Sequence, residues 1–246
     1  MNNLNFKKWI METATVKTRL VIYDFDGTVA NVPEKPNNWN GKDWWGHSDS
    51  LSEPHFNSNH VNYEVVNSFQ KDRSDPNTDV ILLTGRRGVV AHKVRDVLRQ
   101  HKLYGKRVIP DSNKNAINTH VNNLNNGKDI SHPEEENGHE EYYSGDHSTE
   151  ADYPLTPRGK ADGSTSVFKA YIVNKKVTPQ TEIVEFWDDR EDHIPLWTSL
   201  ARDLLDKYGV GRAGNLQKVI YHKVNPSENP AEEAGVKTIT WYAKGY

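Results

Sequence analysis

Cysteine is absent from this 246-residue chain, which excludes disulfide bonds and thiolate metal sites. Long apolar runs are also missing. No window approaches the ~18 apolar residues that a membrane-spanning helix needs, and the mean hydropathy is −0.85. The opening stretch, MNNLNFKKWIMETATVKTR, lacks the apolar core of a secretory signal. We therefore expect a cytoplasmic protein that does not bind membranes.

A strong excess of one charge is absent as well. The formal net charge of −3 argues against a dedicated polyanion-binding protein. The charges are nevertheless unevenly spread, since residues 86–107 hold eight Lys or Arg against the single Asp96, whereas residues 129–152 hold nine Asp or Glu and no Lys or Arg. Two interpretations stay open: a solvated basic helix face with an acidic surface loop, or a basic helix that attracts phosphate-bearing substrates while the acidic loop competes for it.

Short apolar runs alternate with segments of helical periodicity. Helices are predicted within residues 88–103, 164–177 and 191–209, where apolar residues recur every three or four positions. Strands are predicted at Leu20–Tyr23, Val80–Leu83, Arg107–Ile109, Ile183–Trp187 and Val219–Tyr221, with residues 237–241 as a further candidate. This alternation predicts an α/β fold, a parallel sheet with helices on both faces.

Two polar segments interrupt the alternation. Residues 31–60 and 111–165 are predicted to be insertions in a single domain that spans residues 1–246, and we expect the second, long polar insertion to be partly mobile. Its histidines, His132, His139 and His147, fit no common zinc spacing, which favours a solvated loop. The stretch GVGRAG, residues 209–214, matches a dinucleotide-binding pattern, but it follows an expected helix and precedes a strand. It therefore predicts only a helix-to-strand loop.

Polar residues follow several of the predicted strands. Sites in open parallel sheets lie at the carboxyl ends of the strands, so we expect these side chains to converge. The first strand ends in VIYDFDGT and the second in LLTGRR, while EFWDD ends a later one and a lysine lies early in the helix before it. The residues concerned are Asp24, Asp26, Thr84, Gly85, Lys169, Asp188 and Asp189.

This set of groups suits phosphoryl transfer. One carboxylate can attack phosphorus and form an aspartyl-phosphate. A second can protonate the departing alkoxide and later deprotonate water. Mg²⁺, a hard cation that prefers oxygen ligands, would neutralise the carboxylates and hold the phosphate. A hydroxyl and an ammonium would bind the remaining phosphoryl oxygens.

DFDGT, LLTGR, the helical Lys169 and WDD together resemble the four motifs of the haloacid dehalogenase superfamily. The resemblance implies a Rossmann-like core with cap-type insertions, residues 31–60 being a small cap, and a Mg²⁺-dependent phosphatase. It implies that Asp24 is the nucleophile and Asp26 the general acid/base. The implied phosphate binders are Thr84, Gly85 and Lys169, and the implied magnesium ligands are Asp24, the Asp26 carbonyl and Asp188 or Asp189. Lys160, Lys175 and Lys176 remain alternatives to Lys169.

A closer resemblance bears on the substrate. PNNWNGKDWWGHSDSL, LLTGRRG, TSVFK and DDREDH resemble the phosphatase-like domain of the Swiss-army-knife RNA repair proteins, and DDR is also similar to the phosphatase half of polynucleotide kinase-phosphatases. These likenesses imply a phosphate on a nucleotide or on an RNA or DNA end. The chain lacks GxxxxGK[ST], so it is not a P-loop kinase. A small metabolite such as a sugar phosphate or free nucleotide is an alternative substrate, and a non-catalytic nucleic-acid or protein-binding module is an alternative function.

Several residues near the motifs have two interpretations each. Arg86 and Arg190 would either contact the substrate phosphate or pair with the acids of the site. Trp44 and Trp45, with Trp39 nearby, would either stack on a nucleobase or form a small core that anchors their loop. His193 is predicted to be a buried or capping residue rather than a catalytic one.

Overall fold

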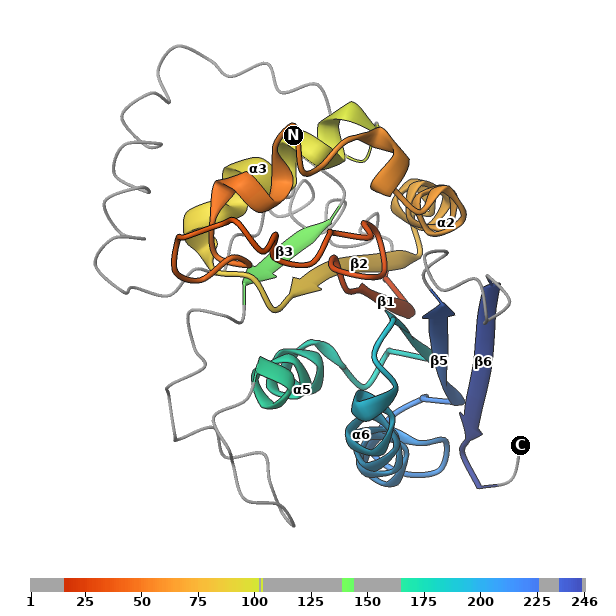
Figure 1. The fold of residues 1–246 in the computed structure, drawn as a ribbon. Helices are drawn as coiled ribbons and strands as arrows, with labels where there is room; N and C mark the ends of the chain where they lie inside the picture. The colour runs from red at the N-terminus through yellow and green to blue at the C-terminus, as the bar shows by residue number, and fades with distance from the viewer. Residues whose placement is uncertain (1–15, 102, 104–138, 144–164, 226–234, 245–246) are drawn as a thin grey trace, which may run out of the picture.

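The computed structural model describes residues 16–101, 103, 139–143, 165–225 and 235–244. Within this part of the chain, six strands form one sheet in the order β3-β2-β1-β4-β5-β6 (Figure 1). The strands are β1 (Arg19–Tyr23), β2 (Thr78–Thr84), β3 (Glu140–Tyr143), β4 (Ile183–Asp188), β5 (Lys218–Asn225) and β6 (Gly235–Tyr242). The α-helices are α2 (Tyr63–Ser74), α3 (Ala91–Gln100), α5 (Thr165–Lys176) and α6 (Ile194–Tyr208). Short 3₁₀ turns lie at Ser48–Leu51, Ser58–His60, Gly88–Val90 and Glu191–His193.

The sheet is covered on both faces, as the continuous apolar runs of its strands predict. Alternate residues of β1 point to opposite sides, so that Val21 and Tyr23 enter a core with α2 and α3, whereas Leu20 and Ile22 enter a core with α5 and α6. Figure 1 shows the two helix pairs on opposite sides of the strands. The predicted α/β, Rossmann-like architecture with helices on both faces is confirmed.

The strand order reverses at β1. The strand β1 pairs in parallel with both β2 and β4, and Tyr23 lies opposite Trp187. The peptide N–H of Asp24 continues this ladder by donating to the Trp187 carbonyl at 2.9 Å. The residues that follow β1 and β4 therefore leave the sheet side by side at a topological switch point, where open parallel sheets bind ligands.

The edges of the sheet differ from the prediction. The last strand, β6, pairs antiparallel with β5, so the sheet is only mostly parallel. On the other edge, β3 falls inside the segment 111–165 that we expected to be a polar insertion. The sequence EEYY carries little strand signal, since it contains two charged residues. The buried carboxylate of Glu141 is tolerated in the strand because Arg95 of α3 pairs with it at 2.8 Å. The predicted strand at 107–109 lies outside the described residues.

One helix was missed by the sequence analysis, and one loop was predicted correctly. The helix α2 was not predicted, although Asn62 caps it and it buries Val65, Val66 and Phe69. The GVGRAG stretch does form the loop between α6 and β5, as predicted. In the described part of the chain, no helix combines the length and the apolar character needed to cross a membrane.

Candidate active site

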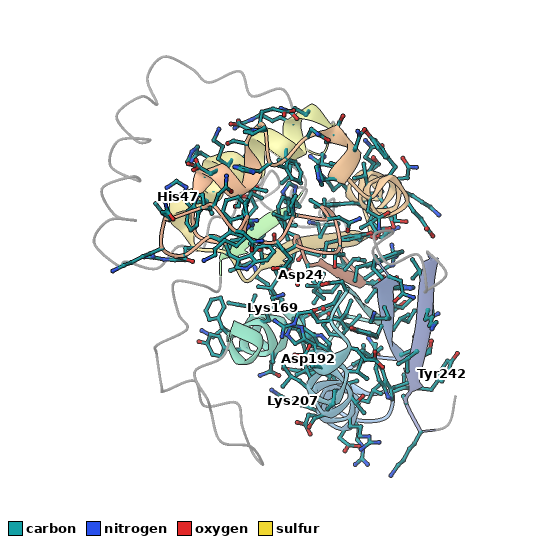
Figure 2. The ribbon with its side chains drawn as sticks, viewed as in Figure 1. Asp24, His47, Lys169, Asp192, Lys207 and Tyr242 are labelled. Carbon is teal, nitrogen blue, oxygen red and sulfur yellow. The ribbon has the colours of Figure 1, made fainter. Side chains whose placement is uncertain are left out.

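A cleft of about 710 Å³ opens at the switch point between β1 and β4. Figure 2 shows Asp24 and Lys169 near the middle of the molecule, between the α2–α3 side and the α5–α6 side. Segments far apart in the sequence supply the walls. The lining residues are Asp24, Asp26, Gly27, Asn31, Val32, Glu34, Trp45, Gly85, Arg86, Lys169, Asp189, Arg190 and His193.

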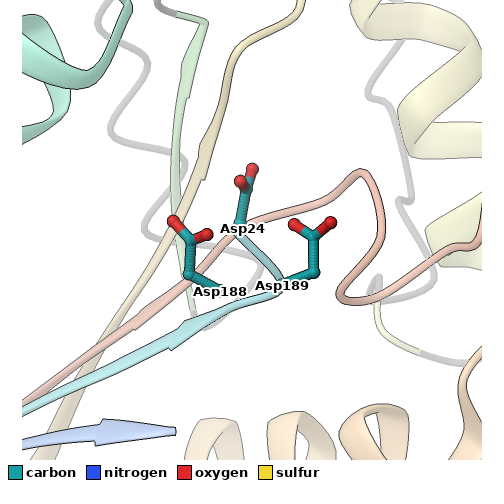
Figure 3. Close-up of side chains that lie close together, drawn as sticks. All are labelled: Asp24, Asp188 and Asp189. Atoms are coloured by element: carbon teal, nitrogen blue, oxygen red, sulfur yellow. The ribbon is translucent and has the colours of Figure 1, made fainter. Parts of the chain in front are cut away.

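Three carboxylates meet beside this cleft, and two of them, Asp24 and Asp189, line it. Asp24 follows β1, Asp188 ends β4 and Asp189 comes next, and one oxygen of each carboxylate lies within 4.8 Å of an oxygen of the other two (Figure 3). Asp24 and Asp188 are buried, and Asp189 is partly buried. The prediction that these residues converge is met by this geometry.

Lys169 brings a positive charge to the cluster. It lies on the second turn of α5, is buried, and its Nζ donates to Asp24 Oδ2 at 2.5 Å. Two alternative lysines point elsewhere, because Lys175 lies over the Tyr171 ring and Lys176 pairs with Glu140. The third alternative, Lys160, falls outside the described residues. Lys169, which was favoured because it lies near the start of a predicted helix, is therefore the lysine that contacts the cluster.

The pKa values of these groups show that the cluster is short of positive charge. Burial, which outweighs the Lys169 ammonium, raises the pKa of Asp24 to about 6. Burial and the two neighbouring carboxylates raise the pKa of Asp189 to about 7. Burial alone would lower the pKa of Lys169, but the surrounding carboxylates raise it. One ammonium is thus not enough for three ionised carboxylates.

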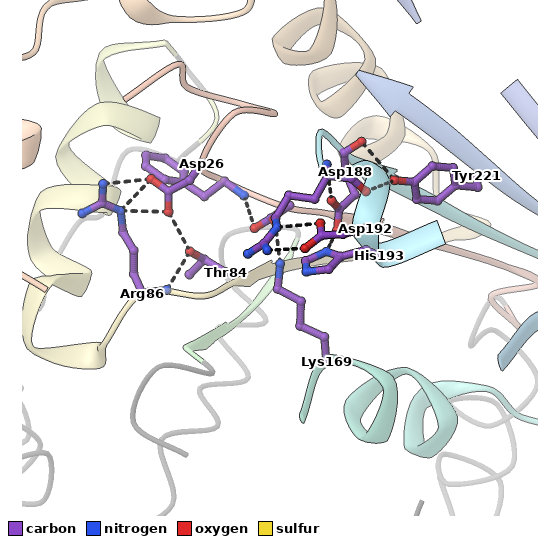
Figure 4. Close-up of polar contacts among 11 residues, drawn as sticks. Asp26, Thr84, Arg86, Lys169, Asp188, Asp192, His193 and Tyr221 are labelled. Atoms are coloured by element: carbon purple, nitrogen blue, oxygen red, sulfur yellow. Dashed lines mark hydrogen bonds and ion pairs between the residues drawn. The ribbon is translucent and has the colours of Figure 1, made fainter. Parts of the chain in front are cut away.

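Asp188 is oriented by the turn that follows β4. Its Oδ1 accepts the peptide N–H of Arg190 at 2.8 Å, and its Oδ2 lies 3.0 Å from His193 Nδ1 (Figure 4). Burial opposes the ionisation of Asp188, but these hydrogen bonds and the Lys169 charge lower its pKa. His193 is buried, as predicted, and it contacts a carboxylate of the cluster. Its side chain makes no capping hydrogen bond to α6.

Glycine at position 27 allows Asp189 to reach the cluster. Gly27 has φ +71°, a conformation that L-residues with a side chain rarely adopt. A Cβ placed there would lie 2.1 Å from Asp189 Oδ2. The glycine of the DFDGT motif therefore has two physical reasons, its backbone conformation and the close approach of Asp189.

Asp26 lines the same cleft as Asp24 and Asp189, and its carboxylate is paired with Arg86. The Arg86 Nε lies 3.0 and 3.1 Å from the two Asp26 oxygens, and Nη2 lies 2.8 Å from Oδ1. Thr84 Oγ1 donates weakly to Asp26 at 3.4 Å and accepts the Arg86 peptide N–H at 3.1 Å. Of the two interpretations of Arg86, the structure supports pairing with an acid. A role of the Asp26 carbonyl as a metal ligand stays a prediction.

The tryptophans divide between the two interpretations. Trp44 is 3% exposed, donates its indole N–H to the Pro33 carbonyl and packs edge-on against Trp39. Of its two interpretations, the structure supports the small core that anchors the loop and does not support a substrate contact. Trp45 is 39% exposed and lines the cleft. Arg190 also lines the cleft, with its guanidinium paired to Asp192.

The arginines at the described positions 86–99 of the basic segment each lie near a carboxylate. Arg86 pairs with Asp26, Arg87 lies 3.5 Å from Asp43, Arg95 pairs with Glu141, and Arg99 pairs with Asp96. The acidic segment thus meets the basic helix through a buried ion pair. His139 in that segment is 4% exposed beside Glu141, so its predicted place in a solvated loop is wrong. His132 and His147 lie outside the described residues.

The donor set suits a divalent oxygen-binding cation. Asp24, Asp188 and Asp189 offer carboxylate oxygens, the ligands that Mg²⁺ prefers. Asp189 Oδ1 is buried and has no hydrogen-bond partner among the described residues. A cation would pair this oxygen and offset the excess negative charge of the cluster. Comparisons of the chain with protein-family models, with curated proteins and with solved structures gave no match.

Proposed function

We propose that this protein is a Mg²⁺-dependent phosphomonoesterase of the haloacid dehalogenase type, which works through an aspartyl-phosphate. The observation that carries the proposal is the buried Asp24 carboxylate, hydrogen-bonded to Lys169 within a cluster of three carboxylates. This cluster opens into a cleft at the switch point of the sheet, large enough for a phosphorylated small molecule or a nucleotide.

In the first step, an oxygen of Asp24 attacks phosphorus while the ester P–O bond breaks. The departing alkoxide takes a proton from the Asp26 carboxyl. Lys169 remains beside Asp24 and offsets charge on the transferring phosphoryl group. Asp24, Asp188 and Asp189 would hold Mg²⁺, which when bound would neutralise the carboxylates and the phosphate charge.

In the second step, water attacks the phosphorus of the aspartyl-phosphate. The Asp26 carboxylate accepts the proton of this water, and the bond between phosphorus and Asp24 breaks. Inorganic phosphate leaves, and both carboxyl groups return to their initial states. The buried Asp24 is rigidly held for both steps, because its Oδ1 also accepts the peptide N–H of Phe25 at 2.8 Å.

The leaving group would lie along the wall that carries Trp45. The exposed ring of this tryptophan supports a nucleobase-containing substrate, a nucleotide or an RNA or DNA end. A second candidate is a small metabolite, such as a sugar phosphate or free nucleotide. The pairing of the arginines of residues 86–99 with carboxylates favours this second candidate, because it weakens the attraction for a polyanion.

The test is phosphate release with Mg²⁺ from 3′- and 5′-phosphorylated oligonucleotides, free nucleotides and sugar phosphates. We expect release by the wild type, and loss of activity in Asp24→Asn. Asp206→Asn removes an exposed carboxylate of α6 and serves as the matched control. A KM that rises steeply with salt would identify a polynucleotide substrate. No release from any substrate, or an active Asp24→Asn variant, would contradict the proposal and favour a binding module.

A further inference from the structure

Arg86 is the most completely buried charged side chain beside the cleft. Its side chain is 0% exposed, compared with 24% for its partner Asp26. Arginine keeps its charge in such surroundings, so the guanidinium must be matched by protein oxygens. The oxygens around it belong to two different parts of the fold.

One side of the guanidinium faces Asp26. Nε donates to both oxygens of the Asp26 carboxylate, at 3.0 and 3.1 Å, and Nη2 lies 2.8 Å from Oδ1, so the guanidinium contacts both carboxylate oxygens. The Thr84 hydroxyl supports the same carboxylate from the strand end at 3.4 Å. Figure 4 shows this group around Asp26, apart from the contacts of Asp188.

The other side of the guanidinium faces residues 45–50 of the loop that follows β1. Nη1 donates to the Trp45 carbonyl at 2.7 Å and to Ser50 Oγ at 2.8 Å. The Ser50 hydroxyl is itself fixed, because it donates to the His47 carbonyl. The rings of Phe25 and Trp45 lie 5.7 Å from the guanidinium carbon. One buried cation therefore joins the wall of the cleft to the carboxylate of Asp26.

We propose that Arg86 is a positioning residue that holds the carboxylate of Asp26 in the orientation needed for hydrolysis of the aspartyl-phosphate. This inference rests on the proposed function. The Arg86 Nε and Nη1 atoms both donate to protein oxygens, which fixes the guanidinium relative to Asp26 and the loop.

The consequence is specific to the second chemical step. With 4-nitrophenyl phosphate, the leaving group departs without a proton, so formation of the aspartyl-phosphate does not need Asp26. Only hydrolysis of that intermediate needs the base. Loss of positioning therefore lowers kcat and KM together and leaves kcat/KM unchanged, because kcat/KM reports the first irreversible step.

The experiment measures steady-state and pre-steady-state release of 4-nitrophenol by the wild type and by Arg86→Lys. Lysine keeps the positive charge but lacks the planar guanidinium, whose several donors contact Asp26 and the loop at the same time. We expect kcat and KM to fall together by roughly 100-fold, the usual size of a general-base contribution. We also expect a burst of nitrophenol near one equivalent per protein, and the same pattern in Asp26→Asn. Ser50→Ala removes one contact and should show a smaller fall in the same two parameters.

Arg87→Lys is the matched control, because Arg87 is the next residue and its side chain is 55% exposed. Melting curves confirm that each variant folds. Equal losses in kcat and kcat/KM in both Arg86→Lys and Ser50→Ala would overturn the inference, since they indicate a structural or phosphate-binding role. Unchanged kinetics in Arg86→Lys would also overturn it. A wild type that releases no nitrophenol, or an active Asp24→Asn, would overturn the proposed function and this inference with it.

Discussion

Asp189 reaches the carboxylate cluster only because its neighbour across the cleft floor has no side chain. Gly27 adopts φ +71°, and the Asp189 carboxylate occupies the space in which a Cβ would lie. With a raised pKa of about 7, Asp189 is the group of the cluster that gains most from a cation. The position of this one carboxylate therefore depends on a glycine in another segment.

We expect Gly27→Ala to weaken Mg²⁺ binding by at least roughly tenfold, because displaced ligands typically lose 10- to 100-fold in metal affinity. Gly211→Ala is a close control, since Gly211 also has positive φ (+81°) but nothing lies within 4 Å of its Cβ position. Both variants share the backbone strain of about 1 kcal/mol, whereas only the first displaces Asp189. Isothermal titration calorimetry measures the affinities. Equal Mg²⁺ affinity in the two variants would contradict this role of Gly27.

The sequence predicted some residues of the site well. Asp24, Asp188, Asp189 and Lys169 converge because the carboxyl ends of parallel strands and the helix before β4 must meet at one edge. For Trp44 the sequence left two roles open, a substrate contact and a loop core, and the structure supports the loop core. Whether an aromatic ring lines a cleft or fills a loop depends on the path of residues 31–60, which no local pattern specifies.

At the scale of elements, a second charged network holds the sheet to α2. Arg19 of β1 donates to Glu185 of β4 at 2.7 Å and to Asp72 of α2 at 2.6 Å. Tyr23 also donates to Asp72, and His222 of β5 lies 3.3 Å from Glu185. Burial opposes the ionisation of Glu185, but hydrogen bonds from His222 and Arg19 lower its pKa to about 2. The network joins the strands on either side of the switch point.

We expect the free energy of unfolding to fall as pH drops from about 4.5, where unfolded glutamate titrates, toward 2. A depressed folded pKa stabilises the protein above this window, and protonation removes that contribution. Glu185→Gln should cost about 2 kcal/mol at pH 7, after allowance for partial exposure, and should reduce the acid slope. Because Glu141 also has a pKa of about 2, some slope remains.

Urea unfolding between pH 2 and 7 measures these quantities. Asp79→Asn is the control, because the Lys17–Asp79 pair has a similar distance of 3.0 Å but is solvent-exposed. It should change stability by less than about 0.5 kcal/mol. An acid slope in Glu185→Gln identical to that of the wild type would show that the network does not stabilise the sheet.

The helix α3 was predicted from its local pattern, whereas α2 was missed despite its cap and apolar stripe, and β3 was missed because it depends on distant partners. The apolar stripe at helical spacing includes Val94 and Leu98 of α3 and Val90 at its N-cap, and the structure buries all three. The four residues of β3 became a strand because β2 pairs with them and Arg95 neutralises Glu141. Neither partner is local in sequence, so a search for apolar periodicity cannot find this strand.

At the scale of the whole molecule, the cluster lies where the two halves of the sheet diverge. Figure 1 shows α2 and α3 on one side of the strands and α5 and α6 on the other. Concentrating three carboxylates there costs stability in the absence of a cation, because like charges repel and burial disfavours ionisation. Cation binding should therefore stabilise the whole fold.

At pH 8 and a Mg²⁺ concentration of 100 times Kd, we expect the Tm to rise by roughly 5–10 °C. Asp189→Asn should melt above the wild type without Mg²⁺, because it removes one repelling charge, and should lose the Mg²⁺-dependent rise. Asp206→Asn should retain that rise. Differential scanning calorimetry with and without Mg²⁺ checks these outcomes, and a full rise in Asp189→Asn would show that the cation binds elsewhere.

The measurement that tests the proposed chemistry most directly is identification of the phosphorylated residue. Asp26→Asn should accumulate the aspartyl-phosphate from 4-nitrophenyl phosphate, because hydrolysis lacks its base. After a rapid acid quench, mass spectrometry of the peptides locates the phosphoryl group. We predict that it lies on Asp24 and that it is absent when Asp24→Asn is added to the same variant. If the enzyme hydrolyses the substrate but no phosphoryl group is found on Asp24, the account is contradicted. The same holds if a phosphorylated peptide persists in the double variant.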